Sequence, residues 1–159
     1  MEKSLDELLK ENFQMKDTEA KSYSPLVLAY IGDGIYDLII RTVVVNRGNT
    51  QANKLHRKTS SLVKAAAQAA MIDELLELLT EEEKAVFKRG RNAKSATMAK
   101  NATMADYRKA TGFEALMGYL YLSNQMERMV YLVKEGLDRA KLVLYRKVIT
   151  KYEIRRIYN

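Results

Sequence analysis

Apolar residues recur at helical spacing along most of the chain, and local signals mark where individual helices begin. Ser24 followed by Pro25 is such a signal, because serine caps a first turn and proline suits the first helical position. The helix that begins here is predicted to run to Gly48. A further helical piece is predicted from 49–50, and the serines at 60–61 lead into a helix rich in alanine and leucine.

The second half of the chain is also predicted to be helical. Thr80 with Glu83 three residues later matches a capping box, so a helix should begin there and fray near Gly90. The remaining predicted segments are a polar loop over 91–104, a helix over 106–123 and a long last helix over 125–152.

The segment 26–45 permits a second interpretation. Its β-branched residues flank a short turn with two glycines, which is also typical of a buried hairpin, and periodicity alone does not separate the two. The helical neighbours favour the helix. The segment is long enough to cross a membrane, but Asp33, Asp37 and Arg41 each cost about 2.5–3.5 kcal/mol near a bilayer centre. We therefore expect no membrane span and, since the N-terminus lacks a signal sequence, a cytoplasmic protein.

The chain length of 159 residues, with 47% hydrophobic and 30% charged residues, is typical of one globular domain. With one proline and no low-complexity tract, no linker divides it. We expect an all-α fold in one helical domain with an extended C-terminal helix. Its parts are an N-terminal helical segment packed on the core over 1–24, a core over 25–125, and a C-terminal helix with a basic tail over 126–159.

Composition excludes several kinds of chemistry. The absence of cysteine excludes disulfides, thiolate metal sites and cysteine nucleophiles, and one histidine, His56, excludes sites built from several histidines. The net charge of +7 indicates a partner that carries phosphates or an anionic surface.

Two acidic residues stand in strongly apolar surroundings. Asp33 lies between Gly32 and Gly34, and Glu114 lies within the apolar run 113–122. A buried carboxylate is costly unless it is paired, protonated or bound to a cation. Two carboxylates from separate helices would suit magnesium or manganese. The plainer alternative is that Asp33 caps a turn and Glu114 pairs with a nearby basic residue.

Short motifs around these acids resemble a known family. The sequence YIGDGI at 30–35 resembles the signature helix of ribonuclease III, and FEALMGYLYL at 113–122 resembles its second catalytic helix. The basic segment LHRK at 55–58 lies between them. The run KRGRNAKS at 88–95 is similar to the short form of the family, the mini-ribonucleases III, which lack an attached domain that binds double-stranded RNA. The resemblance spans about 26–125.

The resemblance implies a ribonuclease III-like endonuclease domain in which Asp33 and Glu114 are the catalytic residues and the metal ligands. Ribonuclease III carries further acids where this chain has Leu26, Ala29 and Thr111, so only two acids are transferred. The implied activity is magnesium-dependent hydrolysis of double-stranded RNA, with manganese as a substitute, giving 5′-phosphate and 3′-hydroxyl ends. Family members act as homodimers through the signature helix.

The implied biological substrate is the precursor of large-subunit ribosomal RNA, with a ribosomal protein as a further partner. The alternative function is a non-catalytic, helical module that binds double-stranded RNA or the ribosome, and the absent acids favour it. No recognition helix supports a DNA-binding protein.

Two basic segments are candidates for contact with the phosphates of a duplex. The first comprises Lys88, Arg89, Arg91, Asn92 and Lys94, where Gly90 would give the backbone room to approach a phosphate. The second comprises Lys54, His56, Arg57, Lys58 and Lys64. The basic tail over 143–159 could lengthen the last helix, contact RNA or meet a partner protein.

Overall fold

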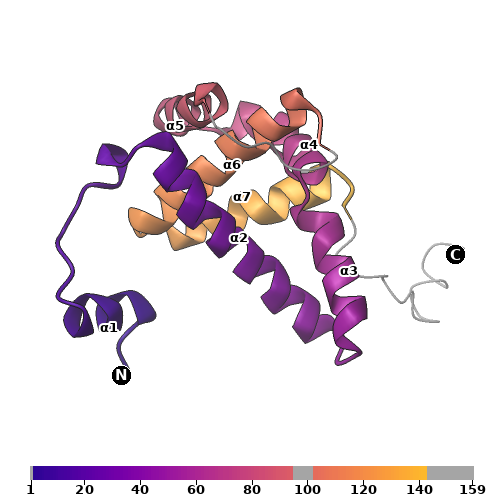
Figure 1. Ribbon diagram of the computed structural model, residues 1–159, viewed down its shortest axis with the longest axis horizontal. Helices are drawn as coiled ribbons and strands as arrows, with labels where there is room; N and C mark the ends of the chain where they lie inside the picture. The colour runs from indigo at the N-terminus through magenta and orange to yellow at the C-terminus, as the bar shows by residue number, and fades with distance from the viewer. Residues whose placement is uncertain (1, 95–101, 143–159) are drawn as a thin grey trace, which may run out of the picture.

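The structure, a computed structural model, describes residues 2–94 and 102–142. Across these residues the chain forms α-helices and two short 3-10 helices and contains no strand (Figure 1). The elements are α1 (Leu5–Asn12), η1 (Ala20–Ser22), α2 (Pro25–Arg47), α3 (Ala52–Val63), α4 (Ala65–Leu75), η2 (Leu76–Leu78), α5 (Glu81–Asn92), α6 (Met104–Leu122) and α7 (Met126–Arg139). The all-α prediction is confirmed, and the hairpin alternative for 26–45 is wrong because α2 runs through that segment without a break.

Helices α2 and α6 cross at the centre of the domain with their backbones in contact (Figure 1). A Cβ atom at Gly32 would lie 1.7 Å from the carbonyl oxygen of Glu114. A Cβ atom at Gly118 would lie 2.0 Å from the carbonyl oxygen of Leu28. Glycine is therefore required at both contact points, one on each helix.

The break between α3 and α4 falls at Lys64, three residues later than the serines at 60–61 indicate. Two carbonyl groups of the last turn of α3 accept hydrogen bonds from side chains. The buried Tyr36 hydroxyl donates to Leu62 O at 2.7 Å, and Gln68 Nε2 donates to Val63 O at 2.7 Å. These tertiary bonds satisfy the helix end, so the chain can turn there without a glycine.

The C-terminal helix is shorter than predicted, and the extended helix over 125–152 is wrong. α7 ends at Arg139, and Lys141 adopts a left-handed conformation with φ 55°. The amides of Lys141 and Leu142 donate to Asp138 O and Leu137 O, which is the Schellman pattern of a helix end. The tail over 143–159 lies outside the described residues.

The segment before α2 meets the core at its last residues. Ala20 is buried and Tyr23 packs against the core, and Ser24 caps α2 by accepting a hydrogen bond from the Val27 amide. No residue of α1 is buried, and its helix lies at the edge of the molecule (Figure 1).

A buried ion pair joins the start of α5 to α7. Glu83 is 3% exposed and accepts two hydrogen bonds from Arg128, at 3.0 and 2.8 Å. The predicted capping box with Thr80 is present at the same carboxylate. Burial alone would raise the pKa of Glu83, but the hydrogen bonds from Arg128 and Thr80 outweigh it and lower the pKa below its ordinary value.

We expect Gly118→Ala to lower the free energy of unfolding by about 3 kcal/mol, because the added methyl group must force α2 and α6 apart. Gly34→Ala is the matched control, since its Cβ meets nothing within 4 Å, and it should be neutral or up to about 1 kcal/mol stabilising. Urea unfolding measures both. Equal stability of the two variants would contradict the close crossing.

We expect Glu83→Gln to cost about 3 kcal/mol of unfolding free energy at pH 7, because it leaves the Arg128 charge without its partner. The folded-state pKa of Glu83 lies below its unfolded value, so this stabilisation is complete above pH 4.5 and is lost as the pH falls through the folded value. Chemical unfolding across this range should show the two proteins converging in acid. Glu81→Gln, at an exposed residue two positions earlier, should change stability by less than about 0.5 kcal/mol.

Candidate active site and RNA-binding surface

The crossing of α2 and α6 brings Asp33 and Glu114 together. Their carboxyl groups are hydrogen-bonded to each other, although the residues lie far apart in the sequence. Neither part of the plainer alternative holds: Asp33 lies in the middle of α2 and caps no turn, and Glu114 is hydrogen-bonded to an acid. The two acids that the sequence singled out therefore lie next to each other in the fold.

The local packing explains why the two side chains meet. Gly32, next to Asp33, lies against the backbone carbonyl of Glu114, so the Cα atoms that carry both acids are held close. Phe113, next to Glu114, is fully buried beneath the crossing. Asp33 is exposed and Glu114 is half-buried, so the pair lies at the surface, where a ligand can reach it.

The two acids repel each other when both are charged, and the pKa of each is raised. Burial, followed by the charge of Asp37 one turn along α2, raises the pKa of Asp33, while the hydrogen bond with Glu114 lowers it. Burial, the charge of Asp33 and the hydrogen bond with Asp33 raise the pKa of Glu114 to about 8. The raised pKa of Glu114 favours a proton shared between the two carboxyl groups.

This donor set fits a hard divalent cation. Both ligating groups are carboxylates, and a cation between them would replace the shared proton and remove their repulsion. Among residues 2–94 and 102–142, no group of three or more histidine, cysteine or acidic side chains could hold a metal ion. An ion bound here would therefore take two protein side chains and complete its shell with water or substrate oxygens, as Mg²⁺ commonly does.

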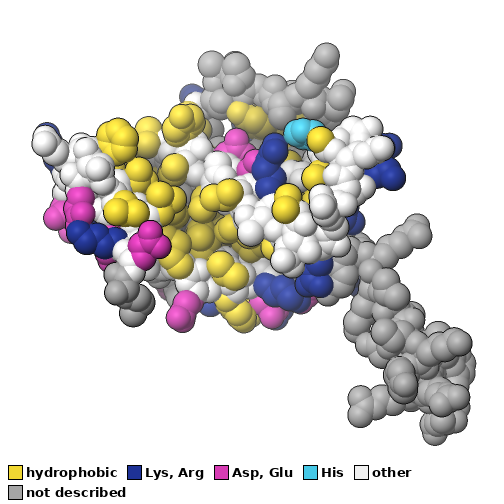
Figure 2. Space-filling view, turned by 90° about the horizontal axis from the view of Figure 1, so that it is seen from below, with side chains coloured by type: hydrophobic (Ala, Val, Ile, Leu, Met, Phe, Trp, Pro, Cys, Tyr) yellow, Lys and Arg dark blue, Asp and Glu magenta, His cyan; other side chains and the backbone are white. Residues whose placement is uncertain are grey.

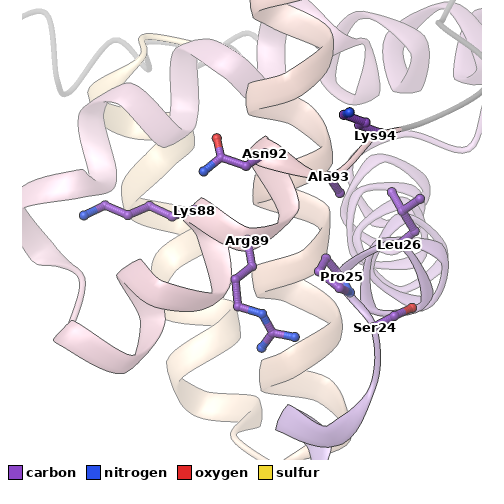
Figure 3. A pocket seen from close by; sticks show the side chains of 8 residues that line it. All are labelled: Ser24, Pro25, Leu26, Lys88, Arg89, Asn92, Ala93 and Lys94. Atoms are coloured by element: carbon purple, nitrogen blue, oxygen red, sulfur yellow. The ribbon is translucent and has the colours of Figure 1, made fainter.

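A shallow groove of about 550 Å³ lies where the end of α5 meets the start of α2 (Figure 3). Its α5 side carries four of the residues predicted to bind RNA, namely Lys88, Arg89, Asn92 and Lys94. Its α2 side consists of Ser24, Pro25 and Leu26, which sequence reasoning missed. The local pattern marks Ser24 and Pro25 only as a helix start, because the packing of α5 against α2 is what brings these three residues to the groove.

Two expectations for this segment were wrong. Gly90 gives no room for a phosphate, because it is a buried helical residue whose Cβ would lie 2.7 Å from Ala115 Cβ and 2.9 Å from Gly112 Cα. It allows α5 and α6 to pack closely.

The loop predicted to begin at 91 is also wrong at its start, since α5 continues to Asn92. Arg91 does not line the groove: its guanidinium lies over the Phe87 ring, 5.6 Å from the centroid.

The second basic segment lies on α3, beside the C-terminal half of α2. Its exposed residues are Lys54, His56, Arg57 and Lys64, and Lys58 is half-buried. His56 lines a small hollow between the two helices together with Arg41, which sequence reasoning did not assign to any site. The two basic surfaces thus flank α2 near its two ends.

The comparisons with known proteins agree with this architecture. Residues 26–125 match the model of the ribonuclease III domain family. A mini-ribonuclease 3 of Clostridium tetani is 53% identical over 127 residues, which cover 79% of this chain and 83% of that protein. A mini-ribonuclease 3 of Enterococcus faecalis is 52% identical over 115 residues, covering 71% and 87%.

A crystal structure of a Fusobacterium nucleatum protein superposes with a TM-score of 0.69 at 29% identity, covering 76% of this chain and 97% of that one. In the described part of this chain, no helix has the length and hydrophobicity to cross a membrane. The family match covers both helices that carry the acid pair. The chain therefore belongs to the ribonuclease III family, in its mini-ribonuclease III branch.

Proposed function

We propose that the chain hydrolyses phosphodiester bonds in double-stranded RNA and uses a magnesium ion held by Asp33 and Glu114. The hydrogen-bonded pair of carboxyl groups at the surface of the α2–α6 crossing carries this proposal. When bound, the ion would polarise the scissile phosphate and lower the pKa of a water molecule that attacks in line. Manganese, which also favours oxygen ligands, is the expected substitute.

The roles of the side chains follow from their chemistry. Asp33 is the more exposed of the two acids, so it is the first ligand that an arriving cation meets. Glu114 must release its shared proton on binding, and its half-buried position keeps water from competing for the same oxygens. Neither residue acts as a nucleophile, and the products carry 5′-phosphate and 3′-hydroxyl ends.

The charge distribution supports a duplex as the substrate. The groove at the end of α5 and the basic surface of α3 flank α2 on either side of Asp33. Double-stranded RNA is held mainly through phosphates and 2′-hydroxyls across a minor groove, so basic side chains at separated positions suit its shape. We assign Lys88, Arg89, Asn92 and Lys94 to one contact, and Lys54, His56, Arg57, Lys58 and Lys64 to the other.

A second copy of the chain completes the proposed enzyme. Several large apolar side chains of α2 are exposed, with Val27 at 47%, Tyr30 at 81%, Leu38 at 54% and Val45 at 59%. Their spacing places them on one side of the helix, as a homodimer interface requires. Two copies would supply one acid pair for each strand of the duplex.

The natural substrate that we propose is the precursor of large-subunit ribosomal RNA, with a ribosomal protein as a partner that presents it. Family resemblance supports this assignment. The rival function, a non-catalytic RNA-binding module, predicts that a duplex remains intact both with magnesium and with a chelator. The proposed enzyme cleaves the duplex with magnesium and leaves it intact with the chelator.

We expect Glu114→Gln to reduce cleavage of a duplex by more than about 100-fold, because it removes a ligand oxygen and its charge while keeping the shape of the side chain. Binding of the same duplex without metal should remain within about twofold. Steady-state cleavage assays and a binding titration measure the two quantities. Glu127→Gln, at an exposed residue of α7, is the control and should cleave normally. A Glu114→Gln variant as active as the unmodified chain would refute the assignment.

We expect the double variant Lys88→Gln/Arg89→Gln to bind a duplex less tightly. The slope of log affinity against log salt concentration should become smaller by up to about two, one for each phosphate contact that is lost. Both residues are exposed and line the groove. Fluorescence titrations at several salt concentrations give the slope. Lys84→Gln removes a positive charge one turn earlier on α5, where it pairs with Glu81, and should leave the slope unchanged. If the double variant keeps the original slope, RNA does not use this groove.

A further inference from the structure

The N-terminal helix α1 has an apolar side that its own chain leaves largely uncovered. Leu5, Leu8 and Leu9 follow one another at helical spacing, which places them on one side of the helix. Phe13, the C-cap of α1, comes four residues after Leu9. Leu5 is 63% exposed and Phe13 is 72% exposed. No residue of α1 is buried against the described part of the chain.

The side of α1 that faces its own core is polar. Asp6 and Lys10, which form an ion pair, line a groove of about 280 Å³ together with Tyr23 and Leu122 of the core. This groove lies between α1 and the end of α6. The leucines of α1 lie on a different side of the helix from Asp6 and Lys10, so they do not reach this part of the core.

A helix of this length needs a surface to pack against. α1 has eight residues, and isolated helices shorter than about 12–15 residues are marginal in water because nucleation is costly. The cap at its start, where Ser4 Oγ accepts a hydrogen bond from the Glu7 amide, satisfies only one of the free amides. Most helical stability in proteins comes from the packing of an amphipathic face. The apolar side of α1 therefore requires a partner surface.

The position of α1 places this apolar side beside other exposed apolar side chains. Figure 2 shows hydrophobic side chains gathered over one face of the molecule, from the side on which α1 lies toward the middle. Both α1 and α2 border this face (Figures 1 and 2). The exposed apolar residues of α2 are the ones that we assign to the homodimer interface.

The size of a stable interface argues that α2 does not form it alone. Stable interfaces bury about 800 Å² on each partner and involve about 20–30 residues a side. The exposed large apolar residues of α2 are only Leu26, Val27, Tyr30, Leu38 and Val45. α1 and the residues that follow it add Leu5, Leu8, Phe13 and Met15.

We infer that the apolar side of α1 packs against a second copy of the chain, as an arm that extends the homodimer interface beyond α2. This inference rests on the proposed function, which includes the homodimer. In a two-fold symmetric dimer each copy provides one arm, so the apolar sides of both arms are covered. RNA is not the partner, because α1 carries three acids and one lysine and would repel phosphates.

The first experiment measures the dissociation constant of the dimer by sedimentation equilibrium for the double variant Leu5→Ser/Phe13→Ser. Both side chains are highly exposed within one copy, so the variant should fold normally, which thermal unfolding checks. We expect the dimer to dissociate about 100-fold more readily or worse, because burial of one large apolar side chain is worth about tenfold in an equilibrium constant.

Two control variants separate the apolar side of α1 from other surfaces. Glu7→Ser places the same new residue on the opposite side of α1. Met104→Ser removes an exposed large apolar side chain at the start of α6. Both variants should keep the dissociation constant within about twofold of that of the unmodified chain.

A second experiment identifies what α1 contacts. The chain contains no cysteine, so Phe13→Cys can be labelled at a single position with a photoreactive group. On illumination we expect a covalent product of twice the chain mass, because the label lies against the second copy. Contact between α1 and its own chain would instead give a product of unchanged mass.

The outcomes distinguish this inference from the proposed function. A dimer that forms equally well with Leu5→Ser/Phe13→Ser, or a label that reacts only within its own chain, would overturn the role of α1 and leave the dimer through α2 intact. A chain that stays monomeric at every concentration would refute the proposed homodimer together with its arm. Neither measurement uses metal or RNA, so loss of cleavage does not affect the result.

Discussion

The contact between the backbones of α2 and α6 is the constraint on which the rest of the structure depends. With a glycine on each helix, Gly32 against Glu114 O and Gly118 against Leu28 O, the two helices approach more closely than any side chain would permit. The crossing fixes the separation of the Cα atoms that carry Asp33 and Glu114. A wider crossing would place a side chain between the helices and separate the two carboxyl groups.

This arrangement holds two repelling acids together, so other interactions must offset the cost. The core directly beneath the pair is well suited to do so. The buried Tyr36 ring packs edge-on against Phe113, with centroids 5.1 Å apart, and its hydroxyl donates to Leu62 O. Tyr36 thereby connects α2 to both α6 and the end of α3. Gly32 before Asp33 is buried, as are Phe113 and Ala115 on either side of Glu114, which leaves little freedom for the acids to move apart.

Helix starts were predictable from sequence, whereas several helix ends were not. Ser24 and Thr80 cap α2 and α5 through hydrogen bonds between residues three apart, which a local pattern contains. The end of α3 depends on Tyr36, and the left-handed Lys141 ends α7 without a glycine, so neither position carries a local signal. The same distinction applies to the site. Family motifs identified the acid pair, but the role of Gly90 in helix packing depends on residues distant in sequence.

Two protein carboxylates leave most of the coordination shell of a magnesium ion to water and phosphate oxygens. In the proposed enzyme, the substrate is therefore part of the metal site, and the position of the duplex affects the chemistry as well as the affinity. This gives α2 a second role besides packing. It carries Leu26 in the groove with α5 and Asp33 in the acid pair on one side of a single rigid helix. Since the groove and Asp33 share one element, a duplex held in the groove would keep a fixed position relative to the acid pair without a conformational change in the protein.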